Sequence, residues 1–486
     1  MDFEAIISAA NGFVWSQFFL LPLLLGTGLF LTVGLRFMPV RKLGYAFSEL
    51  FRKREGTSEG DVSPFAALMT ALSSTVGTGN IAGVAAAIAI GGPGAVFWMW
   101  MTAIFGMATK YAEGVLALKY RETDANGNFV GGPMYYIKNG LGSKWAWLGA
   151  VFAVFGVLAS WGTGALIQSQ SISDAVRATY GGAEGTALYS NMPIIMALVL
   201  AAGAAAVILG GVKRIAGVAS RLVPVMAIAY LGAGLIVIAL NAGAVPEAFG
   251  RIFSSAFGLD AAGTGISIGL LMLAMQKGVA RGIFSNEAGQ GSAPIAHAAA
   301  QNKDPVNQGI IAMLGTVIDT LIICTITALI ILTSGVVGDA CLPSSLTLEV
   351  FQADGQPAGC DTGAPLTVAA FDATLTGIGK HIVTLGLVVF GFTTILGWSY
   401  YGERCCAYLF SEKSVLPFRF SWIVVVFIGA TSIVFEGSVA NIVNLFWLIA
   451  DTLTGLMAAP NLVALIGLSP IIFKLTKDYF DAQSKN

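Results

Sequence analysis

Residues 73–83 read SSTVGTGNIAG and lie in the middle of an apolar stretch that spans residues 64–90. The stretch is long enough for one membrane-spanning helix, but it is interrupted by three glycines, a run of hydroxyl side chains and Asn80. An interrupted helix leaves backbone N–H and C=O groups without partners, and a membrane tolerates this only where the break is buried in protein or lines a cavity. The stretch therefore predicts a broken membrane helix with a binding site at the break.

A second interrupted stretch, GVARGIFSNEAG at residues 278–289, follows an apolar run in the seventh apolar segment. The first interruption lies in the second segment, so the two helices cross the membrane in opposite directions. Broken helices at corresponding positions of two halves are typical of transporters built from inverted repeats. The freed N–H groups and positive helix ends suit an anion, and the freed carbonyls suit a cation. Close helix packing alone would explain Gly79 and Gly83, but not Asn80 or the hydroxyl run.

The composition predicts a polytopic membrane protein. Of the 486 residues, 56% are hydrophobic and only 11% are charged, whereas soluble proteins carry about 25% charged residues. The net charge of −1 gives no indication of nucleic-acid binding. No nucleophile–base pair, cofactor motif or metal-ligand spacing is visible, which argues against an enzyme and against a zinc site. Cys341 and Cys360 share one polar loop and either form a disulfide or remain free thiols.

We expect about eleven membrane-spanning helices, since about 20 apolar residues cross a bilayer. The apolar segments lie near 12–35, 64–90, 93–118, 146–173, 191–211, 217–241, 264–300, 308–334, 368–410, 418–436 and 439–457. The segments at 264–300 and 368–410 exceed one span, so each should include a surface extension. A weaker stretch at 460–474 is expected to lie along the surface or to re-enter. Residues 41–54 are either an amphipathic surface helix or a solvated basic loop.

Basic residues set the expected orientation. The loop after the first segment is rich in Lys and Arg and should be cytoplasmic, which places the N-terminus outside. The loop at 335–366 has no Lys or Arg and should face outward. We therefore expect a multi-pass protein of a bacterial or archaeal plasma (inner) membrane.

Three runs resemble the signatures of the alanine/glycine:cation symporter family, which belongs to the amino acid–polyamine–cation superfamily. They are GGPGAVFWMW at 91–100, RGIFSNEAG at 281–289 and FTTILGWSYYGE at 392–403. The similarity covers nearly the whole chain, from about residue 13 to 475. It implies an all-α fold of the leucine-transporter type, with a five-plus-five inverted repeat and discontinuous core helices 1 and 6. The implied parts of this single transporter domain are an extra helix at 12–35, repeats at 64–241 and 264–457, and a C-terminal segment at 458–486.

The run VGTGN at residues 76–80 resembles the unwound part of core helix 1 in that fold. The resemblance implies that Na⁺ is held by the carbonyls of Ser73 and Val76 and by the hydroxyls of Thr393 and Thr394. Neutral hard oxygens suit Na⁺, and adjacent threonines are about 100° apart on a helix, so both can face one wall. The alternative is that both hydroxyls only bond the preceding helical turn. A second sodium in that fold uses the position of Asn80, and whether this family keeps it stays open.

The same resemblance implies the substrate contacts. The amino-acid carboxylate would rest on unwound backbone, with the contact set Thr78, Gly79, Asn80, Gln168, Leu273, Gly278, Thr394 and Trp398. Gln168 either donates to the carboxylate or bridges two helices. It stands in a QSQS run in which the Asn of the family's QxNS pattern is replaced by Gln170, so the role of that position is in doubt. Trp398 either narrows the pocket to alanine- or glycine-sized side chains or serves packing.

We further hypothesise that Arg281 pairs with a carboxylate, Glu287 or Glu113, to close a cytoplasmic gate. The predicted function is a symporter that couples Na⁺ entry to uptake of alanine or glycine by alternating access. Proton coupling is the alternative within the same fold, because a titrating interior carboxylate would favour H⁺ over Na⁺. A channel or a membrane-embedded enzyme would not concentrate solute in vesicles.

Overall fold

The computed structural model describes residues 3–16, 18–52, 59–259, 268–338, 362–434 and 438–484. Helices make up nearly all of this part of the chain, apart from an antiparallel pair of short strands, β1 (Glu122–Thr123) and β2 (Phe129–Val130). Within these residues seven helices are long and apolar enough to cross a membrane, and one bent pair of helices makes an eighth. The possible disulfide between Cys341 and Cys360 lies outside the described residues.

The first predicted repeat begins with the predicted broken helix, which consists of α5 (Pro64–Thr75), the π-helical turn η1 (Gly79–Gly83) and α6 (Val84–Gly91). Ser63 caps α5 by accepting a hydrogen bond from the Ala66 N–H at 3.1 Å. Val76 adopts an extended conformation, and the two halves of the helix are bent by 55°. The repeat continues with α7 (Gly94–Lys119), α9 (Ala146–Ala159), η4 (Ser160–Leu166), α10 (Ile167–Tyr180), α11 (Ala187–Ile208) and α12 (Gly211–Leu240).

The second predicted repeat also begins with a break, between α14 (Ile268–Asn286) and α15 (Ala293–Ala298). Glu287, Gly289 and Gly291 all have positive φ angles, of 54°, 87° and 82°, which a right-handed helix cannot accommodate. The repeat continues with α16 (Pro305–Ala312), α17 (Leu314–Thr316), the π-helical η6 (Val317–Cys324), α18 (Thr325–Thr333), α20 (Gly363–Thr374), α21 (Gly379–Phe410), α22 (Val415–Thr431) and α23 (Ser438–Gly467).

Shorter helices surround these two sets. The N-terminal part contains α1 (Phe3–Val14), α2 (Leu20–Gly34), α3 (Met38–Arg41) and α4 (Leu43–Phe51), and the chain ends with α24 (Ser469–Gln483). The connections contain α8 (Pro133–Tyr136), η2 (Ile137–Leu141), η3 (Ser143–Trp145), η5 (Ala242–Ala244), α13 (Val245–Ala256), η9 (Glu412–Ser414) and η10 (Ser432–Val434).

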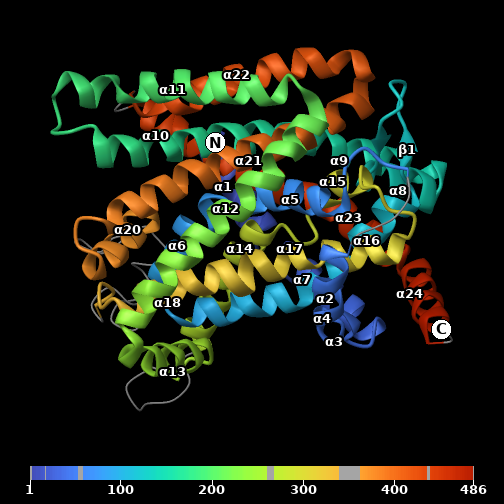
Figure 1. Cartoon of the computed structure of the whole chain (residues 1–486), viewed down its shortest axis with the longest axis horizontal. Helices are drawn as coiled ribbons and strands as arrows, with labels where there is room; N and C mark the ends of the chain where they lie inside the picture. Colours follow the sequence, from blue (N-terminus) through green and yellow to red (C-terminus); the bar gives the residue numbers. More distant parts are fainter. Residues whose placement is uncertain are drawn as a thin grey trace.

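The broken helices lie inside the bundle. In Figure 1, α11 and α22 run side by side along one edge of the molecule, and they pack against one another. The long helix α21 packs against both α5 and α10, and α7 packs against α14 and α16. Within the first break Gly79, Asn80, Ile81 and Gly83 are all buried. The bundle therefore encloses the interrupted backbone, as an interruption at membrane depth requires.

The structure refines several predicted boundaries. The segment expected at 12–35 is two helices, α1 and α2, and the long segment at 368–410 is α20 followed by the spanning helix α21. The segments expected at 439–457 and 460–474 were separated wrongly, because α23 runs without interruption through Pro460 to Gly467. Only α24 remains as a peripheral C-terminal helix. Residues 43–51 do form a helix, α4.

Candidate functional site

The side chain of Asn80 stabilises the backbone conformation of the first break. Its side-chain Oδ1 accepts a hydrogen bond from the backbone N–H of Gly77 at 2.9 Å, which bridges the residues that have left the helix. Its Nδ2 donates to Asp319 Oδ1 at 2.7 Å and approaches the Asp319 carbonyl at 3.3 Å. A single buried amide therefore ties the unwound turn of the first broken helix to η6 of the second repeat.

Thr78 and Gln168 connect the same break to α10. The Thr78 hydroxyl donates to Gln168 Oε1 at 3.2 Å, and Gln168 Nε2 donates to the Thr163 carbonyl at 3.3 Å. A Cβ atom placed on Gly77 would lie 2.5 Å from Thr394 Oγ1 and 3.5 Å from Gln168 Oε1. Glycine is therefore required at residue 77, because α10 and α21 both approach its backbone. Gln168 here bridges two helices, which is one of its two predicted roles.

Thr393 and Thr394 lie at the crossing of α21 with the broken helix. Both hydroxyls donate to the Phe390 carbonyl, at 2.9 and 3.1 Å, as the back-bonding alternative predicted. Thr394 Oγ1 also lies 3.5 Å from the carbonyl oxygen of Val76, while Thr393 Oγ1 lies 3.6 Å from Met226 Sδ of α12. Of the two threonines, Thr394 is the one whose hydroxyl approaches the unwound residues.

Ser73 lies one turn before Val76, where α5 touches α21. A Cβ on Gly397 would lie 2.8 Å from Ser73 Oγ, which shows how closely the two helices approach. The Ser73 hydroxyl donates to the Thr70 carbonyl at 2.7 Å. The close approach brings two of the four predicted sodium ligands, Val76 and Thr394, within 3.5 Å of each other.

Trp398 is only 2% exposed and joins α21 to the second break. Its indole Nε1 donates to Glu287 Oε1 at 2.8 Å, and the other carboxylate oxygen of Glu287 accepts a hydrogen bond from Ser292. A Cβ on Gly164 would lie 2.3 Å from the Cβ of Trp398, so η4 packs directly on the tryptophan. Trp398 therefore lies between the helix that carries Gln168 and the unwound part of the second broken helix.

Asp319 is a central residue that the sequence analysis did not assign to the site. It is fully buried and accepts hydrogen bonds from three side chains, those of Asn80 at 2.7 Å, Ser285 at 2.8 Å and Thr320 at 2.7 Å. Ser285 precedes the second break directly. Asp319 thus connects the two broken helices through one carboxylate. The available signal was a carboxylate in the interior of an apolar segment, which is expensive in a membrane and marks function.

The second break lies at residues 287–292, further along the chain than the predicted contacts Leu273 and Gly278. Both of those residues lie within the continuous helix α14. A Cβ on Gly278 would lie 2.3 Å from the Ala95 carbonyl oxygen, so this glycine serves the packing of α14 on α7. The interruption instead follows Ser285, where Glu287 takes a left-handed conformation.

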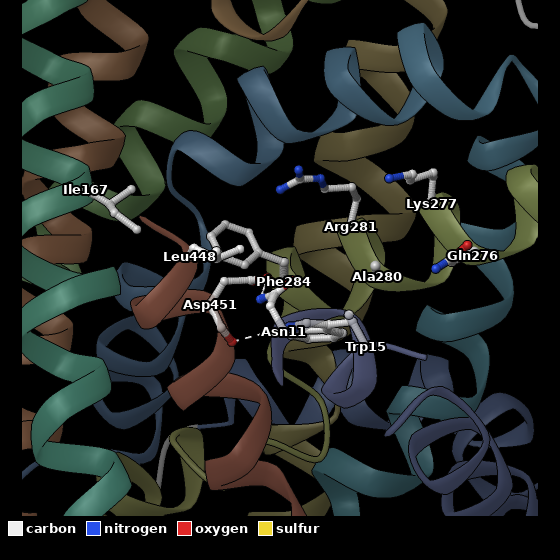
Figure 2. Close-up of a pocket in the computed structure, with 11 residues that line it drawn as sticks. Asn11, Trp15, Ile167, Gln276, Lys277, Ala280, Arg281, Phe284, Leu448 and Asp451 are labelled. Carbon is white, nitrogen blue, oxygen red and sulfur yellow. Dashed lines mark hydrogen bonds between the residues drawn. The ribbon is translucent and has the colours of Figure 1, made fainter. Parts of the chain in front are cut away.

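The predicted gate residues are not partners in this structure. Arg281 lines a cavity of about 530 Å³ together with Lys277, Asn11 and Asp451, and Figure 2 shows the two basic side chains on a different side of the cavity from Asp451. Asn11 Nδ2 donates to Asp451 Oδ2 at 2.9 Å. Among the described residues Arg281 has no ion pair with Glu287 or Glu113. The gate therefore stays a prediction.

Glu113 fixes the second break from another side. Its Oε1 accepts hydrogen bonds from the Gly291 N–H at 3.1 Å and from Asn461 Nδ2 at 2.7 Å. Asn461 Nδ2 also donates to the Gly289 carbonyl at 2.8 Å. Two polar side chains, from α7 and α23, therefore satisfy backbone groups that the interrupted helix leaves free.

Two cavities approach the first break. A cavity of about 570 Å³ extends from Thr78 and Ala82 along α10, α20 and α21 to Asp372 and Lys380. The cavity of Figure 2 approaches from the side of α14 and α23, and Phe284 lies on its wall. A Cβ on Gly79 would lie 3.4 Å from the Phe284 ring, so this ring separates the second cavity from η1.

Comparison with known proteins agrees with this geometry. A family model described as the sodium:alanine symporter family matches residues 1–486. The chain is 48% identical over 483 residues to the sodium/alanine symporter AgcS of Methanococcus maripaludis, covering 99% of this chain and 98% of that protein. It is 38% identical over 477 residues to the putative sodium/proton-dependent alanine carrier protein YrbD of Bacillus subtilis, covering 97% and 92%.

The fold resembles that of MhsT, solved in complex with L-phenylalanine, with a TM-score of 0.54. The alignment covers 86% of this chain and 98% of MhsT at 13% sequence identity, so the likeness concerns the fold alone. It confirms the predicted leucine-transporter-type architecture with discontinuous core helices 1 and 6.

Proposed function

The chain belongs to the sodium:alanine symporter family, and we propose on this premise that it couples inward movement of Na⁺ to the uptake of alanine or glycine by alternating access. It is a multi-pass membrane transporter and not an enzyme. The observation that carries the proposal is that two broken helices meet at a polar centre. The first contributes Val76, Thr78 and Asn80, and the second contributes Ser285. Hydroxyl, amide and carboxylate groups from α10, η6 and α21 contact these residues.

The unwound residues 76–78 supply the polar backbone for an amino acid. Backbone outside the helical hydrogen-bond pattern can donate to a carboxylate and accept from an ammonium group. The Gly77 N–H, which now donates to Asn80 Oδ1, would exchange that partner for the substrate. Thr78 and Gln168 flank this backbone, and their mutual hydrogen bond at 3.2 Å can open to admit the substrate. In this proposal Trp398 and Phe284 supply apolar walls, and the bulk of their rings would restrict the site to a small side chain.

Thr394 and Val76 supply oxygens for the coupling ion. The hydroxyl of Thr394 and the carbonyl of Val76 lie 3.5 Å apart, on one side of the proposed ion position. The carbonyl of Ser73 and the hydroxyl of Thr393 would complete the predicted set of ligands. Such neutral oxygens replace the hydration shell of Na⁺ without burying an opposite charge, whose desolvation would be costly. The membrane potential would add about 2.3 kcal/mol per charge per 100 mV to accumulation.

Asp319 favours the second candidate, proton coupling, or a second cation position. Its carboxylate is buried among Asn80, Ser285 and Thr320 and lies at the contact between the two broken helices. A carboxylate at this place binds either a proton or a metal cation. Either event changes the net charge at the contact between the two broken helices. The name of the relative YrbD includes both sodium and protons, so coupling to H⁺ is the alternative to be tested.

The closing and opening of the site would use the hydrogen bonds that now fix the breaks. Glu287 holds Trp398 and Ser292, and Glu113 holds Gly291, so the second break is locked on the side of α7 and α21. The cavity that starts at Thr78 leads away on the side of α20. We propose that α20 lies outside and the N-terminus too, in a bacterial or archaeal plasma membrane, as the basic loop after α2 indicates.

Uptake of radiolabelled alanine into proteoliposomes tests the proposal, with an inward Na⁺ gradient at fixed pH and zero membrane potential. Accumulation above equilibrium only with the Na⁺ gradient is the expected result. Accumulation driven by a pH gradient in the absence of Na⁺ would replace sodium by proton coupling. Equilibration without accumulation under either gradient would contradict symport, and competition by unlabelled glycine would decide between the two substrates.

A further inference from the structure

A basic cavity of about 410 Å³ lies where α2 ends and α24 crosses the N-terminal helices. Four cations line it, Arg36, Arg41, Lys42 and Lys477, against one carboxylate, Asp481. All four cations are exposed, and within the described part of the chain none of them has an ion pair. Lys42 does contact the Phe480 ring, at 5.0 Å from the ring centroid. The cavity therefore carries an uncompensated positive charge.

The backbone at this cavity is held in an unusual shape. Arg36 and Phe37 both have left-handed conformations, with φ angles of 53° and 58°, although neither is glycine. Such conformations persist only where the surroundings impose them, and they concentrate at ligand sites. The turn directs α3 away from the axis of α2 and brings Arg36 and Arg41 to the same cavity.

Apolar side chains accompany the cations. Phe30, Phe37 and Val40 are 46%, 50% and 45% exposed, and they lie in α2, in the turn after it and in α3, respectively. Leu35, Met38 and Phe473 form apolar lining of the cavity itself. A cluster of cations next to exposed apolar side chains at the end of an apolar helix matches the boundary between lipid headgroups and acyl chains.

We propose that this cavity binds the phosphate headgroup of an anionic phospholipid, with the acyl chains lying along α2 and α3. Guanidinium groups match phosphate in charge and in hydrogen-bond geometry, and the lysines add point charges. A free phosphate ion would satisfy the cations but would leave the exposed apolar surfaces of Phe30, Phe37 and Val40 uncovered. The combination of both features therefore favours the lipid.

The bound lipid would act on the transport core through hydrogen bonds that already exist. Tyr45 of α4 and Tyr479 of α24 share a hydrogen bond at 2.8 Å, and Gln483 donates to Tyr45. Asn307 of α16 donates to Glu49 of α4 at 2.7 Å. The helix α16 starts the span that carries Asp319. A headgroup bound between α2 and α24 would therefore stabilise the position of α16, at the start of that span.

The experiment compares three proteins in detergent: the wild type, the cavity variant R36Q/R41Q/K42Q/K477Q, and a control variant, K119Q/K144Q/K213Q/K413Q, that removes four exposed lysines elsewhere. The thermal midpoint is measured on adding phosphatidylglycerol, phosphatidylcholine or glycerol phosphate. We expect phosphatidylglycerol alone to raise the midpoint of the wild type and of the control, and its apparent affinity for the cavity variant to fall at least tenfold.

An equal response of all three proteins to phosphatidylglycerol would overturn the proposal, because the lipid would then act without the cavity. An equal rise of the midpoint with glycerol phosphate would also overturn it and would indicate a free-anion site. The double variant R41Q/K42Q changes only two exposed side chains of the cavity. It keeps the test decisive if the quadruple variant does not fold, and it should lose part of the lipid response.

Discussion

Thr394 Oγ1 lies 3.5 Å from the carbonyl oxygen of Val76, although 318 positions separate the two residues in the chain. This contact joins the long helix α21 to the break in the first broken helix, at a place where a Cβ on Gly77 would collide with the same hydroxyl at 2.5 Å. The two repeats therefore meet at the pair of oxygen atoms that we propose as sodium ligands.

Replacing Thr394 by valine should weaken Na⁺ binding while the packing of α21 is kept, because valine has the shape of threonine without the hydroxyl. A hydrogen bond or ligand contact to a charged group is worth about 1.5–3 kcal/mol, so the Na⁺ concentration for half-maximal uptake should rise about tenfold or more. Alanine uptake into proteoliposomes as a function of Na⁺ measures this. Ser399→Ala is the matched control, since within the described part of the chain the Ser399 hydroxyl bonds only the Leu396 carbonyl of the same helix. An unchanged Na⁺ dependence in Thr394→Val would remove Thr394 from the ion site.

Replacing Asp319 by asparagine should abolish coupled uptake while the protein stays folded. Asparagine keeps the size of the side chain and part of its hydrogen bonds to Asn80, Ser285 and Thr320, but it removes the negative charge. Uptake driven by a Na⁺ gradient and uptake driven by a pH gradient are measured separately. Loss of both identifies Asp319 as part of coupling.

Asp478→Asn serves as the control for Asp319→Asn, because Asp478 is an exposed carboxylate of α24. The control should transport like the wild type. Wild-type accumulation by Asp319→Asn would show that the buried carboxylate has a purely structural role. Its thermal midpoint, recorded alongside, separates loss of coupling from loss of the fold.

Replacing Trp398 by leucine should widen the range of substrates. The indole fills space between η4 and the second break, and its removal leaves room for a larger side chain. The ratio of valine uptake to alanine uptake should rise by roughly tenfold, the scale expected when an apolar pocket changes by one or two methylene groups. Competition of unlabelled amino acids against labelled alanine measures the ratio.

Trp398→Phe gives a finer test of the same residue. Phenylalanine keeps a ring but loses the hydrogen bond from Nε1 to Glu287. If that bond locks the second break, Trp398→Phe and Glu287→Gln should change the transport rate to a similar degree, and the double variant should add little to either. Fully additive effects would show that the two residues act independently.

Replacing Arg404 by glutamine should destabilise the end of α21. Arg404 is 8% exposed and pairs with Asp124 at 3.2 Å, Glu403 at 2.8 Å and Glu412 at 3.4 Å. Removing one partner from a buried ion network costs about 3–5 kcal/mol, because the remaining charges stay buried without compensation. The thermal midpoint in detergent should fall clearly.

Lys138→Gln is the matched control for Arg404→Gln. Its pair with Glu122 at 3.1 Å is much more exposed, and exposed pairs contribute no more than about 1 kcal/mol. Equal midpoints for both variants would mean that the network around Arg404 adds no more to stability than an exposed pair does.

The sequence predicted more of the fold than of the site. The break at residues 73–83 and the second interrupted segment follow from local composition, because glycine and polar residues inside an apolar segment permit few structures in a membrane. The position of the second break was predicted less well. Leu273 and Gly278 lie in continuous helix, while the first left-handed residue of the break is Glu287, a residue type that only tertiary contacts hold in that conformation.

The sequence by itself determined that this protein crosses the membrane many times, that two of its helices are broken, and that it belongs with cation-coupled amino-acid transporters. The first two properties follow from local composition, and the third follows from the resemblance of three short runs to the signatures of a known family. Only the tertiary structure decided that Asp319 joins both broken helices, that Thr394 reaches Val76 and that Arg281 faces the cavity of Asp451. Each of these relationships depends on how helices far apart in the chain cross, and no local pattern specifies that.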